Sequence, residues 1–175
     1  MNLNIDAEKK NTYDAIVVGT GISGGWAAKE LTEKGLKTLV LERGRMVKHP
    51  EYPTATKDPW QLPYASRPTQ EDLKNQGVQA RTGYTVQQTT KHWFVNDLEH
   101  PYIETKRFDW MRGYHVGGRS IMWGRQSYRW SPMDFEANAK DGIAVDWPIR
   151  YNDLEKWYDY VETFAGISGQ AEGLA

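Results

Sequence analysis

The chain has 175 residues, which is enough for one domain with a sizeable core but hardly enough for two. Its 22 Lys and Arg residues nearly balance its 23 Asp and Glu residues, so no net positive field would draw in nucleic acid or an anionic membrane. The chain contains no cysteine, which excludes disulfides and thiolate chemistry, and no apolar run near the roughly 20 residues of a membrane-spanning helix.

The first predicted element is a β-strand over Tyr13–Val18, preceded by a polar lead-in over residues 1–12. Four consecutive apolar residues in this strand predict burial on both faces, as in a parallel sheet covered by helices. Lys9 and Lys10 resemble the charged start of a secretion signal, but Asp14 interrupts the junction with the apolar run. We therefore expect a strand here and no targeting peptide.

A helix and a second strand follow. The pattern becomes helical from Ser23, and Gly35 is a fitting end for that helix. The apolar run within Lys37–Glu42 predicts the second strand. Residues 13–44 therefore form a βαβ unit of the expected length, about 30 residues.

The turn between the first strand and the helix carries the most informative motif. Residues 19–24 read Gly-Thr-Gly-Ile-Ser-Gly. Three glycines allow a sharp turn, a close approach of the backbone to a pyrophosphate, and tight packing of helix on strand. Glu42 lies 23 residues after Gly19, at a strand tip where its carboxylate would accept hydrogen bonds from an adenosine ribose. This combination predicts a dinucleotide site.

Residues 45–110 form a long polar and aromatic stretch with weak periodicity. A compact domain rarely uses so long a connection unless it covers or builds a site, so we expect a lid-like excursion. Within it, the sequence predicts a helix over Gln70–Asn75 and extended chain over Gly83–Thr89.

Helix signals return after the excursion. Ser131 before Pro132 predicts an N-cap followed by proline at the first helical position, and this helix should end before Gly142. Asn152 is expected to cap a second helix, with Glu155 completing a pair similar to a capping box.

Four pieces of the sequence carry a family resemblance. They are the glycine turn at 19–24, the strand end Leu41–Gly44, the segment Val116–Gly124 and the stretch Trp147–Leu154. Together they resemble the N-terminal part of the glucose-methanol-choline (GMC) oxidoreductases, especially the sugar-oxidising branch near pyranose oxidases and bacterial glucoside dehydrogenases. The third piece, at this distance behind the first, is the most specific. The resemblance covers residues 12–168.

The resemblance implies FAD rather than NAD. The βαβ unit would hold the ADP half of FAD, and residues 111–175 would supply the flavin-side segment and two helices of an α/β, Rossmann-type FAD domain with a parallel sheet. The expected ADP-side contacts are Gly19, Gly21, Ile22, Ser23, Gly24, Glu42 and Arg43. The expected flavin-side contacts are Gly117, Gly118, Ser120, Met122, Trp123 and Gly124.

The mode of FAD attachment follows from one position. Some relatives bind FAD covalently through a histidine two residues after the serine of the flavin-side segment. That position is Met122 here, which cannot form the link, so noncovalent FAD is expected. The glycine pair would let the backbone run against the flat isoalloxazine, with N–H donors near its electron-rich edge.

The implied activity is oxidation of a CH–OH group of a sugar or glycoside. A base removes the hydroxyl proton, hydride passes to flavin N5, and an unidentified electron acceptor reoxidises the flavin. In such enzymes the base lies in a C-terminal substrate domain, so we assign no catalytic residue here and expect the FAD domain to be incomplete.

The expected partner is the rest of the enzyme or a complementary subunit. The cytoplasm is the default location, with periplasmic export beside a signal-bearing partner as the alternative.

Other interpretations stay open. The chain could be a dinucleotide-binding module without chemistry of its own, or an NAD-dependent dehydrogenase, which Glu42 would suit equally. Metal chemistry is not expected, because the four histidines lack short ligand spacings. Aromatic faces that stack on sugar C–H surfaces give mild support to a sugar substrate, although core or flavin packing would explain each of them singly. These aromatic residues are Trp93, Trp110, Trp123 and Trp130.

Overall fold

The structure is a computed structural model that describes residues 12–52 and 56–170. The chain divides into two compact units, with the boundary between Trp123 and Gly124. Nearly all of the lead-in predicted for residues 1–12 lies outside the described residues. In the described part of the chain, no helix is long and apolar enough to cross a membrane.

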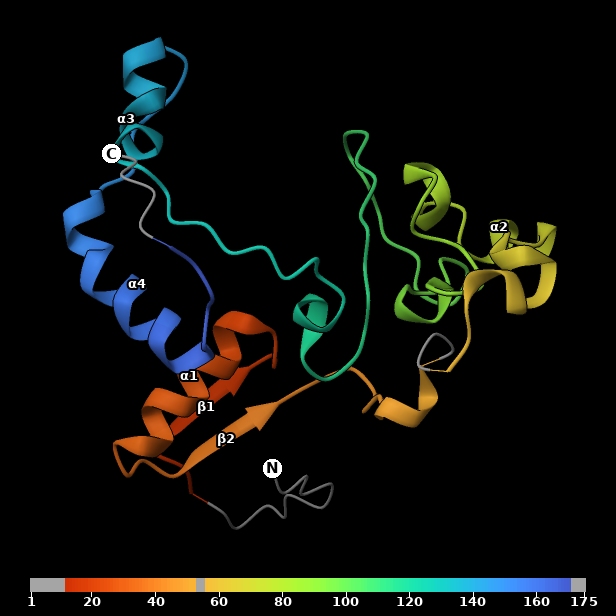
Figure 1. Cartoon of the computed structure of the whole chain (residues 1–175), viewed down its shortest axis with the longest axis horizontal. Helices are drawn as coiled ribbons and strands as arrows, with labels where there is room; N and C mark the ends of the chain where they lie inside the picture. The colour runs from red at the N-terminus through yellow and green to blue at the C-terminus, as the bar shows by residue number, and fades with distance from the viewer. Residues whose placement is uncertain (1–11, 53–55, 171–175) are drawn as a thin grey trace. The chain divides into compact units, whose positions relative to one another are not determined.

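The first unit begins with the predicted βαβ arrangement. Strands β1 (Ala15–Val18) and β2 (Thr38–Leu41) pair in parallel, with Ala15 opposite Thr38 and Val18 opposite Leu41. Helix α1 (Ile22–Glu33) connects them and packs against both strands (Figure 1). The mixed α/β character and the parallel pairing are confirmed. The small sheet is compatible with part of a Rossmann-type domain.

The end of α1 explains the glycine that follows it. Lys34 is the C-cap, and Gly35 adopts a left-handed conformation with φ of +83°. The Gly35 amide donates to the Thr32 carbonyl at 3.0 Å, and the Leu36 amide donates to the Leu31 carbonyl at 3.1 Å. These two bonds form a Schellman motif, which satisfies carbonyls that the helix itself leaves free. Gly35 therefore ends the helix, one residue beyond the C-cap.

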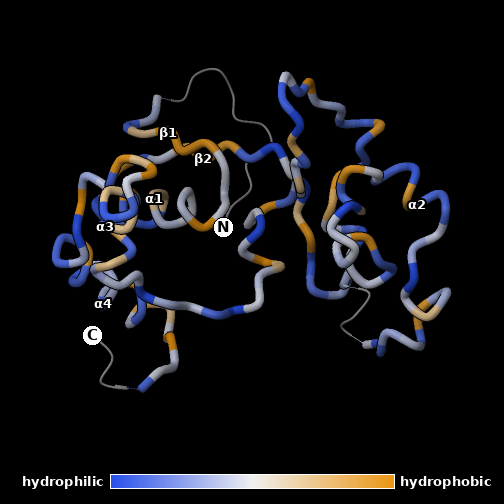
Figure 2. Tube along the Cα trace, turned by 90° about the horizontal axis from the view of Figure 1, so that it is seen from above, coloured by the Kyte–Doolittle hydropathy of each residue, from blue (hydrophilic) through white to orange (hydrophobic). Residues whose placement is uncertain are grey.

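The prediction that the first strand is buried on both faces is wrong. Val17 is 8% exposed, but Ile16 and Val18 are 61% and 81% exposed. Alternate side chains of a strand point to opposite faces, and α1 covers the face that carries Val17. The other face has no covering layer among the described residues of the first unit, although both strands are hydrophobic (Figure 2).

The excursion is built from short helical turns. Its predicted helix is confirmed as α2, with bounds Gln70–Asn75. The segment Gly83–Thr89 forms bends and turns, so the prediction of extended chain is wrong. The hydroxyls of Thr85 and Thr90 donate to the carbonyls of Gln79 and Thr85, and such local bonds favour turns over extended chain. The described 3₁₀ turns of this unit are η1 (His49–Glu51), η3 (Pro59–Gln61), η4 (Pro63–Ser66), η5 (Gln79–Thr82), η6 (Lys91–Trp93) and η7 (Gly118–Ile121).

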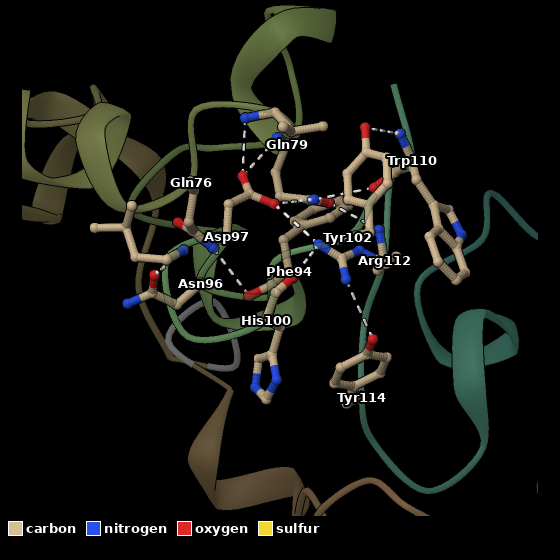
Figure 3. Close-up of polar contacts among 12 residues, drawn as sticks. Gln76, Gln79, Phe94, Asn96, Asp97, His100, Tyr102, Trp110, Arg112 and Tyr114 are labelled. Atoms are coloured by element: carbon tan, nitrogen blue, oxygen red, sulfur yellow. Dashed lines mark hydrogen bonds and ion pairs between the residues drawn. The ribbon is translucent and has the colours of Figure 1, made fainter. Parts of the chain in front are cut away.

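A buried polar network holds the excursion together (Figure 3). The side chain of Gln79 is fully buried. Its Nε2 donates to Asp97 Oδ1 at 2.8 Å and to the Trp110 carbonyl at 3.0 Å, while its Oε1 accepts from the Arg112 amide at 2.8 Å. The Arg112 guanidinium in turn donates to the His100 carbonyl at 2.6 Å and to Asp97 at 3.3 Å. The segment therefore has an ordered interior of its own.

The second unit contains two helices. Helix α3 spans Pro132–Asp141 and is followed by Gly142 in a left-handed conformation, which confirms the predicted start and end. Helix α4 spans Tyr151–Ala165, and its N-cap is Arg150 rather than the predicted Asn152. The Asp153 carboxylate accepts from the Arg150 amide at 2.8 Å. The helix thus begins where a carboxylate at its third residue can reach back to a free amide.

Candidate functional site

The glycine turn extends the end of β1 toward the end of β2. Gly19 has φ of +92°, a left-handed conformation that favours glycine. Its amide donates to the Leu41 carbonyl at 2.7 Å, which carries the pairing of the two strands one step into the turn. The turn is therefore fixed to the carboxyl ends of the two strands, where Glu42 follows β2.

Gly24 sets the distance between the helix and the turn. A Cβ placed on this residue would lie 2.1 Å from the Gly19 carbonyl oxygen and 3.4 Å from Val17 Cγ1. Real side chains do not tolerate the shorter distance, so α1 can lie this close to β1 only with glycine here. This is the close helix–strand packing expected for the last glycine of a dinucleotide fingerprint.

The start of α1 offers free backbone donors. Gly21 is the N-cap and carries no side chain to occupy the first amides of the helix. A Cβ built on Gly19 or Gly21 would meet no atom within 4 Å beyond its neighbouring residues, and Ile22 and Ser23 are exposed. Open space, free N–H groups and the positive end of the helix together suit a phosphate group.

Glu42 is engaged by the turn. Its Oε2 accepts from the Thr20 amide at 2.8 Å and from the Thr20 hydroxyl at 2.5 Å, and its Oε1 accepts from the Gly44 amide at 2.8 Å. Partial burial raises the pKa of the Glu42 carboxyl, but the bonds from Thr20 and Gly44 outweigh burial and lower the pKa below its ordinary value. Glu42 is therefore an ionised hydrogen-bond acceptor at neutral pH.

The second glycine pair lies against the first turn. The Gly117 amide donates to the Thr20 hydroxyl oxygen at 3.0 Å, across 97 positions of sequence. A Cβ placed on Gly118 would lie 3.1 Å from Gly21 Cα, and both glycines of the pair have positive φ, at +88° and +55°. Two segments that the sequence predicted to face one cofactor are thus adjacent in the fold.

A short parallel bridge places the second glycine pair. Arg45 and His115 form the bridge: the Arg45 amide donates to the Tyr114 carbonyl at 3.3 Å, and the Val116 amide donates to the Arg45 carbonyl at 2.9 Å. A Cβ on Gly44 would lie 2.1 Å from the His115 backbone nitrogen, so this approach also requires glycine. The chain leaving β2 thereby guides residues 114–118 toward the turn.

The remaining predicted contacts are placed less centrally. The Ser120 hydroxyl donates to the Gly117 carbonyl within η7, and Met122 is the C-cap of that turn. Trp123 is exposed, and Gly124 belongs to the second unit. The structure brings together the residues from Gly19 to Gly24, Glu42, Gly117 and Gly118.

Two residues with a structural role were not predicted. Thr20 links Glu42 to Gly117. The ring of Tyr114 lies 3.7 Å from the Arg43 guanidinium carbon and so orients a residue that was predicted to contact the nucleotide. Thr20 could have been suspected, because a hydroxyl between two turn glycines lies close to the tip of the neighbouring strand.

The described residues therefore define an α/β unit whose turn and helix start could bind a dinucleotide. No family model matches the chain. It is 27% identical to a 2-methyl-1,2-propanediol dehydrogenase of Mycolicibacterium austroafricanum over 89% of this chain and 25% of the relative. It is 29% identical to a gluconate 2-dehydrogenase flavoprotein of Pantoea cypripedii over 94% and 27%. It is 26% identical to a fructose dehydrogenase large subunit of Gluconobacter japonicus over 89% and 27%.

These relatives are GMC-family oxidoreductases, so the resemblance to that family is confirmed across most of the chain. Oxygen-dependent choline dehydrogenases also match, at 28% identity over 86% of the chain. The chain spans about a quarter of the length of the curated relatives it matches. By their names, the relatives are dehydrogenases of a diol, of gluconate and of fructose, and one of them is a flavoprotein.

Proposed function

We propose that this chain is the FAD-binding portion of an enzyme that oxidises a CH–OH group of a sugar or glycoside. One observation carries the proposal. The second glycine pair, at Gly117 and Gly118, packs on a turn whose amides and open space suit a pyrophosphate. Dinucleotide-binding turns are widespread, but a second glycine segment packed on such a turn fits a cofactor that extends from one to the other. The similarity to a relative that is named a flavoprotein supports the same assignment.

The residues of the turn fit the ADP half of FAD. The amides at the start of α1 would hold the pyrophosphate, with Gly19 and Gly21 leaving room for it. Glu42, held as a carboxylate by Thr20 and Gly44, would accept a hydrogen bond from the adenosine ribose. Arg43, held against Tyr114, lies beside this carboxylate in the sequence and would border the adenosine. Residues 13–44 are thus proposed as the ADP-binding part.

The flavin-side residues would border the ring of the flavin. Gly117 and Gly118 would let the backbone lie against a flat ring, and Ser120, Met122, Trp123 and Gly124 would flank it. Because Met122 stands where a covalent attachment would require histidine, we propose noncovalent binding. We further propose that the excursion acts as a lid over the completed site.

The chemistry would be shared between this chain and its partner. When bound, the flavin would accept the hydride at N5. No residue here is assigned as the base, which would come from the rest of the enzyme or a complementary subunit. Two relatives are named a flavoprotein and a large subunit, which supports a multisubunit context. We propose the cytoplasm as the default location, with co-export to the periplasm beside a partner as the alternative.

The test begins with the colour of the purified full-length protein. We expect the visible absorption bands of an oxidised flavin, and acid precipitation should release the flavin into the supernatant because it is not covalently attached. Flavin that stays with the precipitate would contradict the noncovalent assignment. A colourless protein that reduces NAD with an alcohol would instead establish the NAD-dependent alternative.

A turnover assay then separates enzyme from binding module. Glucosides, free sugars and simple diols are first offered without oxygen and without any electron acceptor, and bleaching of the flavin is followed. Turnover is then measured with an artificial electron acceptor. Bleaching by glucosides or sugars supports the proposal. Bleaching by a diol alone would overturn the sugar assignment. A flavin that no alcohol bleaches would favour a dinucleotide-binding module without its own catalysis.

A further inference from the structure

Three segments of the first unit meet at the hydroxyl of Thr20. This hydroxyl donates to Glu42 Oε2 at 2.5 Å, 22 positions away in sequence, and accepts from the Gly117 amide at 3.0 Å, 97 positions away. A hydroxyl has one donor and two acceptor positions, so a single group can serve both bonds. Each bond polarises the other, which strengthens such a chain of hydrogen bonds.

We propose that Thr20 is a positioning residue that couples the ribose-binding carboxylate to the flavin-side glycine pair. This inference rests on the proposed function. Glu42 is held in place by Thr20, and Gly117 is held by the same side chain, so the two ends of the cofactor site share one fixed point. Loss of the hydroxyl would remove one bond from each end together, while Glu42 would keep its bonds from the Thr20 and Gly44 amides. Thr20 itself need not contact the cofactor.

The geometry also limits how the ribose can bind. Oε2 of Glu42 already accepts two hydrogen bonds from Thr20, and Oε1 accepts one from Gly44. The Arg43 backbone amide is a further hydrogen-bonding contact of this carboxylate. Because these contacts take up most of the acceptor positions of the carboxylate, the orientation that Thr20 fixes decides where a hydrogen bond from the ribose can form.

The experiment compares Thr20→Val with Thr20→Ser in the full-length protein. Valine keeps the shape of threonine without the hydroxyl, and serine keeps the hydroxyl without the methyl group. Thr32→Val is the matched control, because the Thr32 hydroxyl donates only within α1, to the carbonyls of Ala28 and Lys29. Each protein is examined by amide hydrogen exchange at Gly117 without FAD, and by FAD titration followed through flavin fluorescence.

We expect Thr20→Val to speed exchange at Gly117 and to weaken FAD binding by about tenfold, the size of one typical hydrogen bond. Thr20→Ser should restore most of both properties, and Thr32→Val should change neither. Should Thr20→Val leave Gly117 exchange unchanged, or change it no more than Thr32→Val does, the coupling is overturned. Faster exchange with unaltered FAD affinity would overturn the positioning role.

The two proposals fail in different ways. If the wild-type protein binds no FAD, the proposed function is wrong, and the role of Thr20 toward that cofactor falls with it. The exchange of Gly117 still shows whether Thr20 joins the two segments, because that measurement needs no cofactor. If the wild type binds FAD and Thr20→Val does not fold, the comparison of Thr20→Ser with the wild type decides. A serine that fails to hold Gly117 would overturn the link.

Discussion

The glycine turn and the excursion are both held by hydrogen bonds, but the bonds differ in kind. The turn depends on backbone atoms packed too closely for any side chain, as at Gly24. The excursion depends on buried side-chain amides and charges, with Gln79 at the centre. A turn of the first kind is sensitive to added atoms, whereas a network of the second kind is sensitive to lost partners.

The largest effect is expected from adding one methyl group to the turn. In Gly24→Ala the new Cβ would lie 2.1 Å from the Gly19 carbonyl, so α1 must move away from β1. Overpacking typically costs about 1–3 kcal/mol, and a clash with backbone should lie at the upper end. We therefore expect the free energy of unfolding, measured by urea denaturation, to fall by about 3 kcal/mol.

The neighbouring glycine is the control for this substitution. A Cβ on Gly25 would meet nothing within 4 Å, and Gly25 lies inside α1. Gly25→Ala should therefore stabilise the protein by about 0.5–1 kcal/mol, because alanine is the better helix former. Equal destabilisation by both substitutions would mean that the turn does not depend on close backbone packing.

The excursion should respond to the loss of a hydrogen-bonding group when the length of the side chain is kept. Gln79→Met keeps the length of the side chain but leaves the Arg112 amide and the Trp110 carbonyl without their partner. Buried groups left unpaired cost about 2 kcal/mol in the free energy of unfolding.

Gln70 provides the comparison for that loss. It is exposed at the start of α2, and Gln70→Met should stay within about 0.5 kcal/mol of the wild type. Thermal unfolding followed by circular dichroism measures both variants. A Gln79→Met protein as stable as Gln70→Met would show that the buried network does not hold the excursion together.

The same contrast explains how much of the fold the sequence predicted. Apolar runs and glycines act over a few residues, so β1, β2, α1 and the bounds of α2 and α3 could be predicted from local pattern. Gln79 could not, because its partners lie 18 to 33 positions away and nothing in its neighbourhood marks a glutamine as buried. The exposure of Ile16 was missed for a related reason, since a run of apolar residues does not reveal whether a second layer covers it.

Prediction of the candidate site from the sequence was limited in the same way as prediction of the fold. The spacing of the glycines and of Glu42 follows from the length of a βαβ unit, so these positions could be predicted. Thr20 occupies a variable position of the fingerprint, and its role depends on Gly117, which only the folded chain brings near. The family resemblance predicted that Gly117 and Gly118 face the same cofactor, but not the hydrogen bond that joins the two segments.

The stability of the glycine turn also depends on one side chain, that of Glu42, as the stability of the excursion depends on Gln79. Glu42→Gln would turn an NH₂ group toward either the Gly44 amide or the Thr20 amide, each of which donates to the carboxylate in the wild type. We expect a loss of about 1–2 kcal/mol in the free energy of unfolding, even without cofactor. Glu33→Gln is the control, because Glu33 is exposed on α1 and its ion pair with Lys29 contributes little. If the two variants are equally stable, Glu42 serves only a ligand.

The excursion and the glycine turn should lose stability at different pH values as the solution is acidified. The pKa of His92 is lowered from 6.5 to about 4, chiefly by burial, with the positive charge of Arg45 and the nearby His115 acting in the same direction. The unfolded chain then binds a proton that the folded chain does not, so stability is full above pH 6.5 and falls as the pH drops toward 4. Because His92 is only half-buried, this effect should be the smallest of the four.

Glu42 behaves differently over the same range. Its pKa is lowered, so the stability that it contributes is present above its ordinary value of 4.5 and is lost only as the pH falls below that value. Between pH 6.5 and 4.5, the loss should therefore come from the histidine side, and His92→Asn should flatten the dependence of the unfolding free energy on pH. A variant that keeps the full slope would show that His92 is protonated at the same pH in the folded and unfolded chains. The acid sensitivity would then have to come from His115, whose pKa burial also lowers.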